Sequence, residues 1–321
     1  MPPNPIRKLR RALPALVLLV VSACGALSRC AAPRPLDDVS MAALYANPPP
    51  PPAGPLAVFH LGHSLVGRDM PAMLAQLSGP GARYDSQLGW GTPLKAHWGD
   101  AAINGFDAEN AHPRFRDAKE ALASGDYDAV VLTEMVEIRD AIRSFASWDY
   151  LARWAKLAWE GDPAARVYLY ETWHPLDDPE GWLNRLDRDP KRYWEDEILR
   201  PALAADGGRP IYVIPAGDVL AAFSRAVAAR GGLDGIAGPE DLFALMPDGA
   251  RDQIHLGDLG AYLVALTHYA VLYQRSPVGL PYALLRADGT PATAPGAEAA
   301  RLMQETVWQV VRGHPLTGVP R

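Results

Sequence analysis

Cysteine is nearly missing from this sequence, since Cys24 and Cys30 are the only two among 321 residues. Both precede the part of the chain that has a globular composition, so a disulfide framework and a thiolate metal site are excluded from that part. An excess of positive charge is missing as well, because the formal net charge is -6. Nucleic acid is therefore not expected as a partner. The apolar run 13–21 is short for a membrane span of about 20 residues.

The N-terminal residues have the pattern of an export signal. Four basic residues lie at positions 7–11, the apolar run 13–21 follows, and small residues lead to Cys24. A cysteine at this point resembles the box of bacterial lipoproteins, in which the thiol is acylated after cleavage. We therefore expect a signal peptide over 1–23 and lipidation of Cys24. The protein is expected in the cell envelope, lipid-anchored and facing the periplasm or the exterior.

A proline-rich segment comes next, with five successive prolines at 48–52. Such a run forms a stiff polyproline II rod and has little ability to build a core. We predict that residues 24–54 are a tether that holds a domain away from the membrane. Recognition by a proline-binding module is the alternative. Residues 55–321 are predicted to form the folded domain.

Short β-rich runs alternate with amphipathic stretches after residue 55, which predicts a parallel sheet with helices on both faces. The segment 231–247 is rich in Gly and Pro and is predicted as a loop. Strands are predicted at 56–61, 83–88, 129–133, 167–170 and 211–214. Helices are predicted at 70–77, 93–103, 115–123, 148–159, 193–205, 216–229, 259–273 and 297–311.

The first candidate for chemistry lies in residues 58–68. An apolar run typical of a buried parallel strand stops at Gly62, Ser64 follows two residues later, and a helix is predicted shortly after. Open α/β sheets build their sites at the carboxyl ends of the strands. Ser64 is therefore either a nucleophile at that edge or a serine that caps the turn or helix.

The second candidate lies in residues 247–258, predicted as a loop before a helix. Asp252 and His255 are three residues apart, so in a turn the carboxylate can reach one imidazole nitrogen. The other nitrogen is then free to take a proton from a hydroxyl, which a weak serine nucleophile requires. Taken alone, the pattern is equally typical of a capped helix start with a surface histidine.

Together the two candidates resemble the layout of the SGNH, or GDSL-like, hydrolases over residues 56–277. The resemblance implies a flavodoxin-like α/β/α sandwich with about five parallel strands, built without a cofactor. It also implies ester hydrolysis through an acyl-enzyme. On the matching positions Ser64 is the nucleophile, His255 the general base and Asp252 its orienting partner. His63 stands where the family motif has Asp, a position outside the triad.

In this family the oxyanion hole combines the backbone N–H of the nucleophile, here Ser64, with a glycine and an asparagine. The segment 88–94 resembles the glycine block, with Gly91 as the predicted donor and Gly89 as the alternative. The block that should carry the asparagine departs from the family, because Thr133 and Glu134 stand there. The Thr133 hydroxyl is therefore the predicted third donor.

Three residues near these blocks are predicted to bind the substrate: Glu134, Trp90 and His63. An ionised Glu134 would oppose an oxyanion, so it is expected to bind substrate hydroxyls or to hold His63 or Arg68. Trp90, Trp98 and Trp173 lie near strand ends, where they either line a cleft or cover the sheet edge. No metal is predicted, because His60 and His63 lack a matched third ligand. His174, after the fourth predicted strand, either lines the cleft or has a packing or capping role. Four other histidines are predicted to be ordinary helix or loop residues: His97, His112, His268 and His314.

The sequence thus predicts an exported serine esterase that acts on a small-molecule or glycan ester, with O-acetyl groups on a glycan as the favoured substrate. A lipase or lysophospholipase is the enzymatic alternative and would need a wide apolar groove beside Ser64. The missing asparagine motivates a third hypothesis, in which the protein is a non-catalytic glycan-binding lipoprotein that retains the fold. In each case the membrane is the partner of the N-terminal lipid anchor.

Overall fold

Five parallel strands form one sheet in the order β2-β1-β3-β4-β5. All five predicted strands are present, and their ends differ from the predicted ends by no more than two residues. The residues of β1 and β3 are buried along the whole of each strand, as the continuous apolar runs require. The strands are β1 (Ala57–His63), β2 (Arg83–Gly89), β3 (Ala129–Leu132), β4 (Arg166–Glu171) and β5 (Tyr212–Pro215).

The computed structural model describes residues 33–100 and 102–321. The predicted signal peptide, the lipidation site Cys24 and Cys30 lie outside the described residues. Among the residues that are described, no helix combines the length and the apolar character needed to cross a bilayer.

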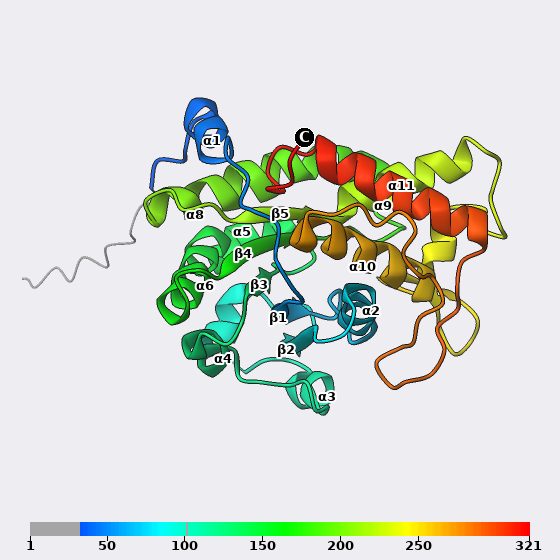
Figure 1. Ribbon diagram of the computed structural model, residues 1–321, viewed down its shortest axis with the longest axis horizontal. Coiled ribbons are helices and arrows are strands. Elements are labelled where there is room, and N and C mark those ends of the chain that lie inside the picture. The colour runs from blue at the N-terminus through cyan, green and yellow to red at the C-terminus, as the bar shows by residue number, and fades with distance from the viewer. Residues whose placement is uncertain (1–32, 101) are drawn as a thin grey trace, which may run out of the picture. The chain divides into compact units, whose positions relative to one another are not determined.

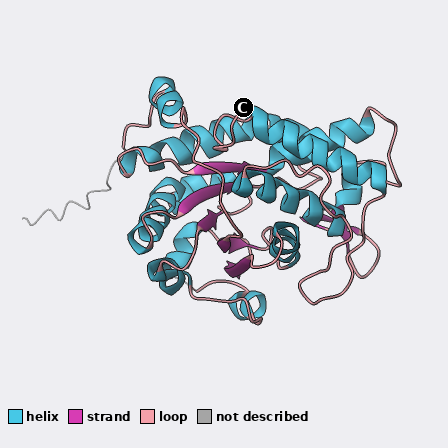
Figure 2. Ribbon diagram, in the orientation of Figure 1, coloured by secondary structure: helices cyan, strands magenta, loops and turns pink. Residues whose placement is uncertain are grey.

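Helices cover both faces of the sheet, so the architecture is a three-layer α/β/α sandwich (Figures 1 and 2). Alternate residues of β1 enter two separate cores, with Val58 in one and Phe59 and Leu61 in the other. The first core is built with α2 (Asp69–Ser78), α7 (Trp182–Asp189), α9 (Ala216–Ala228), α10 (Asp258–Tyr273) and α11 (Ala297–Gly313). The second is built with α4 (Ala118–Ser124), α5 (Ile138–Phe145), α6 (Ser147–Gly161), the π-helical segment η2 (Pro190–Leu199) and α8 (Arg200–Ala205).

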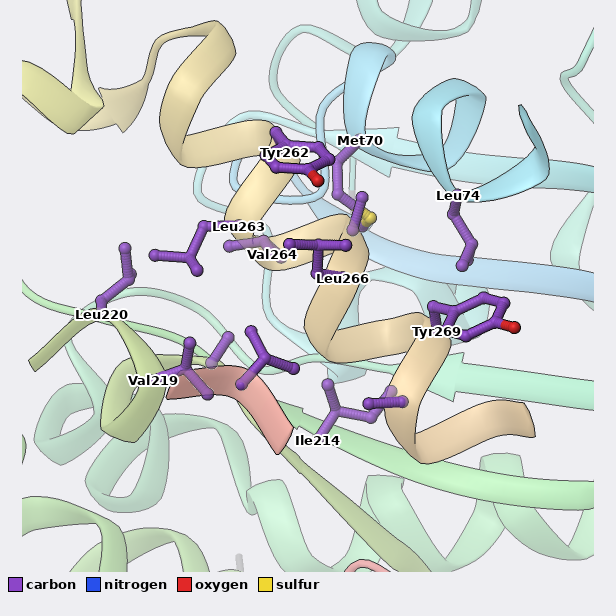
Figure 3. Packing of buried hydrophobic residues seen from close by; sticks show 14 of the residues in the cluster. Met70, Leu74, Ile214, Val219, Leu220, Tyr262, Leu263, Val264, Leu266 and Tyr269 are labelled. Atoms are coloured by element: carbon purple, nitrogen blue, oxygen red, sulfur yellow. The ribbon is translucent and has the colours of Figure 1, made fainter. Parts of the chain in front are cut away.

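Helix α10 is buried on almost every side, which its continuously apolar sequence demands. Figure 3 shows side chains of α10, among them Val264, packed in one cluster with Met70 of α2, Ile214 of β5 and Val219 of α9. This packing fixes the helix relative to the sheet. Because α10 begins three residues after His255, it also fixes the segment that carries the predicted base.

Several shorter elements differ from the prediction. The predicted helix 93–103 ends at Asp100, and Gly99 within it has a positive φ of 113°. The helix predicted from residue 115 begins at Ala118, after Asp117 accepts a hydrogen bond from the backbone N–H of Glu120. The remaining elements are η1 (Ala96–Asp100), α3 (Phe106–Asn110), η3 (Pro239–Leu242), β6 (Phe243–Leu245) and β7 (Arg251–Leu256).

The strands β6 and β7 pair antiparallel, so the Asp-x-x-His motif lies on a strand and the predicted loop 231–247 contains part of a hairpin. β6 is only three residues long, and its partner is the motif strand itself. Neither strand has enough alternating residues to be recognised by pattern.

The described part of the predicted tether is not a free spacer. Residues 38–44 form α1 (Asp38–Leu44), and Met41 is buried in the second core. The Tyr45 hydroxyl donates to Ile211 O at 2.5 Å, and Arg166 donates to the carbonyl of Pro50 at 2.5 Å. The folded unit therefore begins before residue 55, because proline composition says nothing about the contacts that neighbouring residues make.

Candidate active site

Ser64 lies in the turn that joins β1 to α2. Val66 N donates to His63 O at 2.9 Å and closes this turn directly around Ser64. Gly62 is required just before it, because a Cβ there would lie 2.3 Å from Thr133 Cγ2 of the neighbouring chain segment. The strand, glycine and turn thus place a half-buried serine at the carboxyl end of the sheet.

Asp252 and His255 lie in a bulge of β7. The ladder with β6 pairs Phe243 with Leu256 and Leu245 with Arg251, and the register shifts between these two pairs. Asp252 Oδ1 accepts the backbone N–H groups of Ile254 and His255, each at 2.8 Å. The side chain of Asp252 therefore shapes the bulge that presents His255.

The structure brings Ser64, His255 and Asp252 into one hydrogen-bonded line. His255 Nδ1 lies 2.9 Å from Asp252 Oδ2, and His255 Nε2 lies 3.0 Å from Ser64 Oγ. An ionised carboxylate only accepts, so the proton is on Nδ1 and Nε2 accepts the Ser64 O–H. This is the tautomer that a general base needs.

The carboxylate of this line is ionised. Burial opposes the charge, but the hydrogen bonds from the backbone N–H groups of His255 and Ile254 and from the His255 ring outweigh it. Together they lower the pKa of Asp252 below its ordinary value. A negative charge beside Nδ1 is the arrangement that stabilises an imidazolium.

A cavity of about 550 Å³ opens at Ser64 and His255. Much of its lining is apolar and includes Met70, Trp173, Phe243 and Leu245. Charged residues share the lining, and two of the cations are paired: Arg286 with Asp258 at 2.6 Å, and Arg251 with Asp241 at 3.3 Å. The charged lining residues are Arg68, Asp69, Asp241, Arg251, Asp258 and Arg286.

Trp173 is the predicted aromatic residue that reaches this cavity. It is almost fully buried, and its Nε1 donates to Ile254 O at 2.8 Å, within the bulge that carries the histidine. Of the two roles proposed for it, Trp173 lines the cleft. Arg251 and Arg286 were missed by the sequence, because nothing local marks a surface arginine as part of a cavity wall.

The predicted role of Thr133 in the oxyanion hole is wrong. Its hydroxyl is fully buried and donates to Tyr170 O at 2.7 Å, and its backbone N–H donates to Leu61 O at 3.1 Å. Both donors are therefore engaged within the sheet. The sequence could not show this, because the acceptors come from β4 and β1.

The predicted contact of His63 and Glu134 with substrate is also wrong, because both side chains are completely buried. His63 Nε2 lies 2.8 Å from the backbone carbonyl of Glu134, so the expected link between these residues runs through the main chain. Burial lowers the pKa of His63 to about 4 and raises that of Glu134 to about 7.

The glycine block begins beside the Ser64 turn, since Gly89 pairs with His63 in the parallel ladder. Gly91 is exposed, with a positive φ of 53°, and its role as a donor stays a prediction. Trp90 is 57% exposed, and its indole N–H donates to Glu109 Oε1 at 2.8 Å. Trp90 and Gly91 do not belong to the lining of the described cavity.

His97 was predicted to be ordinary, yet it lies against the same turn. Its Nε2 is 2.7 Å from Gly62 O, and its Nδ1 is 3.0 Å from Gln87 Nε2. It is nearly fully buried, and burial lowers its pKa to about 4. No sequence pattern connects it to Gly62, which lies 35 residues earlier.

Across residues 33–100 and 102–321, no group of three or more His, Cys, Asp or Glu side chains is placed to hold a metal ion. His60 and His63 point into different surroundings. The His60 ring lies 5.8 Å from the His268 ring in the core, whereas His63 faces the Ser64 turn.

Three solved structures align with two thirds or more of this chain. A DUF4886 family protein from Bacteroides uniformis aligns with a TM-score of 0.50 at 15% identity, over 80% of this chain and 94% of that one. A GDSL-like lipase candidate from Parabacteroides merdae aligns with a TM-score of 0.42 at 12% identity, over 70% and 99% of the two chains. A carbohydrate acetylesterase from Sinorhizobium meliloti aligns with a TM-score of 0.35 at 15% identity, over 67% and 96%.

No protein-family model matches the sequence, and no curated protein sequence matches it. At 15% identity, the similarity to the DUF4886 family protein concerns the fold alone. The class defined by the fold is therefore a three-layer α/β/α sandwich with a five-stranded parallel sheet.

Proposed function

We propose that the protein is a serine ester hydrolase of the SGNH type. The observation that carries this proposal is the continuous line from Asp252 through His255 to Ser64, with distances of 2.9 and 3.0 Å, at the mouth of a cavity. The three residues come from segments almost 190 residues apart. A hydrogen-bonded nucleophile, base and orienting carboxylate is the arrangement that acyl transfer requires.

In the proposed reaction, Ser64 Oγ adds to the ester carbonyl carbon while its proton passes to His255 Nε2. The carbonyl electron pair moves onto oxygen and returns when the bond to the alcohol breaks, and His255 gives its proton to the departing oxygen. Water then attacks the acyl-enzyme, with His255 again as the base, and the acid and free Ser64 are released. The Ser64 N–H and the predicted Gly91 N–H stabilise the negative oxygen.

The cavity wall combines apolar and charged side chains, and the charged ones favour a substrate with a polar part. Six charged side chains line it, and a long acyl chain would have to bury part of its surface against them. This supports a short acyl group on a polar acceptor, such as an O-acetyl group on a glycan. A lipase with a wide apolar groove is less consistent with such a lining.

A glycan-binding protein without activity is the second candidate. The hydroxyl and the backbone N–H of Thr133 both donate to carbonyl groups of the sheet. Thr133 therefore does not replace the third oxyanion donor of the family. A weak oxyanion hole costs about 10²-fold to 10³-fold in turnover for each missing donor. Retention of the complete Ser64, His255 and Asp252 line favours the enzyme.

The deciding experiment measures hydrolysis of p-nitrophenyl esters from acetate to palmitate by the full-length chain. Ser64→Ala should lower kcat by about 10⁴-fold or more, since it removes the nucleophile. Ser224→Ala is the matched control, because Ser224 is a buried serine of α9 whose hydroxyl has no hydrogen-bond partner within the described part of the chain. Equal rates for wild type and Ser64→Ala on every ester would favour the binding protein.

The proposal places the protein in the cell envelope, exported by residues 1–23 and anchored through Cys24. Cys24→Ser should move the chain from the membrane fraction to the aqueous fraction. Retention of the variant in the membrane fraction would argue for an uncleaved anchor.

A further inference from the structure

The turn that carries Ser64 is held from beneath by a buried histidine. His63 Nε2 lies 2.8 Å from Glu134 O, and His63 Nδ1 lies 3.3 Å from Leu65 N. A carbonyl only accepts and a backbone N–H only donates, so the ring is neutral, with its proton on Nε2. With the bond from Val66 N to His63 O, both the side chain and the main chain of His63 close the turn around Ser64.

A second buried histidine ties the strand just before this turn to the segment that follows the glycine block. His97 Nε2 donates to Gly62 O at 2.7 Å, and His97 Nδ1 accepts from Gln87 Nε2 at 3.0 Å. The Gln87 amide is itself oriented, because its Oε1 accepts the backbone N–H of Ala118 at 2.8 Å. His97 is therefore held in the same neutral tautomer as His63.

Glu134 joins the end of β3 to the segment that follows the glycine block. Its Oε1 accepts the backbone N–H of Leu94 at 3.2 Å and that of Met135 at 2.8 Å. Leu94 begins the helical stretch directly after the loop that contains Gly91, and it is fully buried. The end of β3 thus holds the far end of the glycine loop through a side-chain oxygen.

Burying these three polar side chains carries a desolvation cost. His63, His97 and Glu134 are almost fully shielded from water, and none of them has an opposite charge as its hydrogen-bond partner. Apolar residues would fill the same space without the desolvation penalty. Among the described residues, Glu134 Oε2 has no hydrogen-bond partner, whereas Glu134 Oε1 and the two rings each have fixed partners. Such hydrogen bonds favour a single arrangement of the segments that they join, which apolar packing enforces less strictly.

We propose that His63, His97 and Glu134 are positioning residues that set the Ser64 turn and the 89–94 loop relative to each other. The inference rests on the proposed esterase function. None of the three can touch a substrate, since water does not reach them. They act through Leu65 N, Gly62 O and Leu94 N, which belong to the two segments expected to supply Ser64 Oγ and the oxyanion donors.

The test uses paired variants of the full-length chain. Glu134→Met removes the acceptor with little change in volume, whereas Glu134→Gln keeps an amide oxygen for Leu94 N. His63→Leu removes both ring bonds, whereas His63→Gln keeps a donor for the Glu134 carbonyl. We expect Glu134→Met and His63→Leu to lower kcat by about 100-fold with KM within about threefold, because the cavity is untouched and only alignment is lost. The two glutamine variants should stay within about tenfold of wild-type kcat.

Matched controls come from a separate hollow of about 270 Å³. His314 Nδ1 accepts Leu316 N at 3.2 Å, the same local bond that His63 makes, and Glu171 is a buried carboxyl at the end of β4. His314→Leu and Glu171→Met should cost stability without lowering kcat more than about threefold.

A substrate-free measurement separates this inference from the esterase proposal. Hydrogen exchange of the peptides containing Leu65 and Leu94 should accelerate at least tenfold in His63→Leu and Glu134→Met, respectively, and in neither control. Unchanged exchange would overturn the positioning role whether or not the wild type hydrolyses esters. The positioning role would also be overturned if His63→Leu and Glu134→Met lowered kcat no more than the controls do. The same holds if the two glutamine variants were as slow as His63→Leu and Glu134→Met. If the wild type shows no Ser64-dependent hydrolysis, only the esterase proposal is overturned.

Discussion

The two sides of Ser64 use the same residue types in opposite ways. On the open side, the His255 side chain is 44% exposed and has Asp252 as its partner. On the closed side, His63 is fully buried and bonds only to backbone groups. A carboxylate partner is the arrangement that stabilises an imidazolium, which the proposed reaction requires of His255. A carbonyl and an N–H partner require a neutral ring, so His63 is built to keep its geometry.

The largest expected effect tests the open side. Asp252→Asn would keep an oxygen for the N–H groups of Ile254 and His255 but turn its NH₂ group toward His255 Nδ1. The proton would then move to Nε2, which could no longer accept from Ser64. We expect kcat for p-nitrophenyl acetate to fall by about 10⁴-fold. Asp140→Asn is the control, since Asp140 pairs with the exposed Arg143. A fall of less than tenfold for Asp252→Asn would contradict the proposed line.

The second prediction compares buried groups on the closed side through the pH dependence of stability. Burial lowers the pKa of His63 to about 4, so between pH 6.5 and 4 the unfolded state binds the proton more readily. Stability is therefore lost as pH falls through this window. Burial raises the pKa of Glu134 to about 7, so between pH 4.5 and 7 the folded state keeps a proton that the unfolded state releases. Stability is therefore lost as pH rises.

Unfolding by urea across this pH range checks both signs. His63→Leu should flatten the fall in the free energy of unfolding below pH 6.5, and Glu134→Gln should flatten the fall toward pH 7. Each pKa unit is equivalent to about 1.4 kcal/mol. Changes of the same sign in both variants would show that one of these groups is not in the stated protonation state.

The smallest expected effect concerns the cavity wall. Leu245 of β6 lines the cavity and remains 64% exposed, so it offers an apolar surface to an acyl chain. Leu245→Ser should raise KM for the butyrate ester by about threefold and leave the acetate ester nearly unchanged, as expected for the loss of contact with one or two methylene groups. An equal change for both esters would place the acyl chain elsewhere in the cavity.

The strands and the main residues of the proposed site could be predicted from the sequence, because each depends on a local pattern. Four of the five sheet strands contain a short apolar run near turn-forming residues, whereas β2 has the sequence RYDSQLG. Ser64 follows such a run, and Asp252 and His255 are close enough in sequence to meet through one bulge. The resemblance to a known family supplied the expectation that these two segments come together.

The errors share one physical cause, which is that burial and hydrogen-bond partners come from distant segments. Thr133 was assigned to the oxyanion hole, yet its hydroxyl is taken by Tyr170 O. Glu134 was assigned to the substrate, yet it holds Leu94 N beneath the site. The tether was extended to residue 54 from composition, although Met41 enters the core.

By itself, the sequence determined the class of fold and named the residues for which we propose chemistry. Alternation of apolar runs with amphipathic stretches allows few arrangements other than a parallel sheet covered by helices. Only the tertiary structure decided which histidine faces solvent and which is buried beside the Ser64 turn. That choice depends on the side chains and backbone groups that β1, β3 and β7 bring together, and these determine both the solvation of each ring and the partner that selects its protonation state.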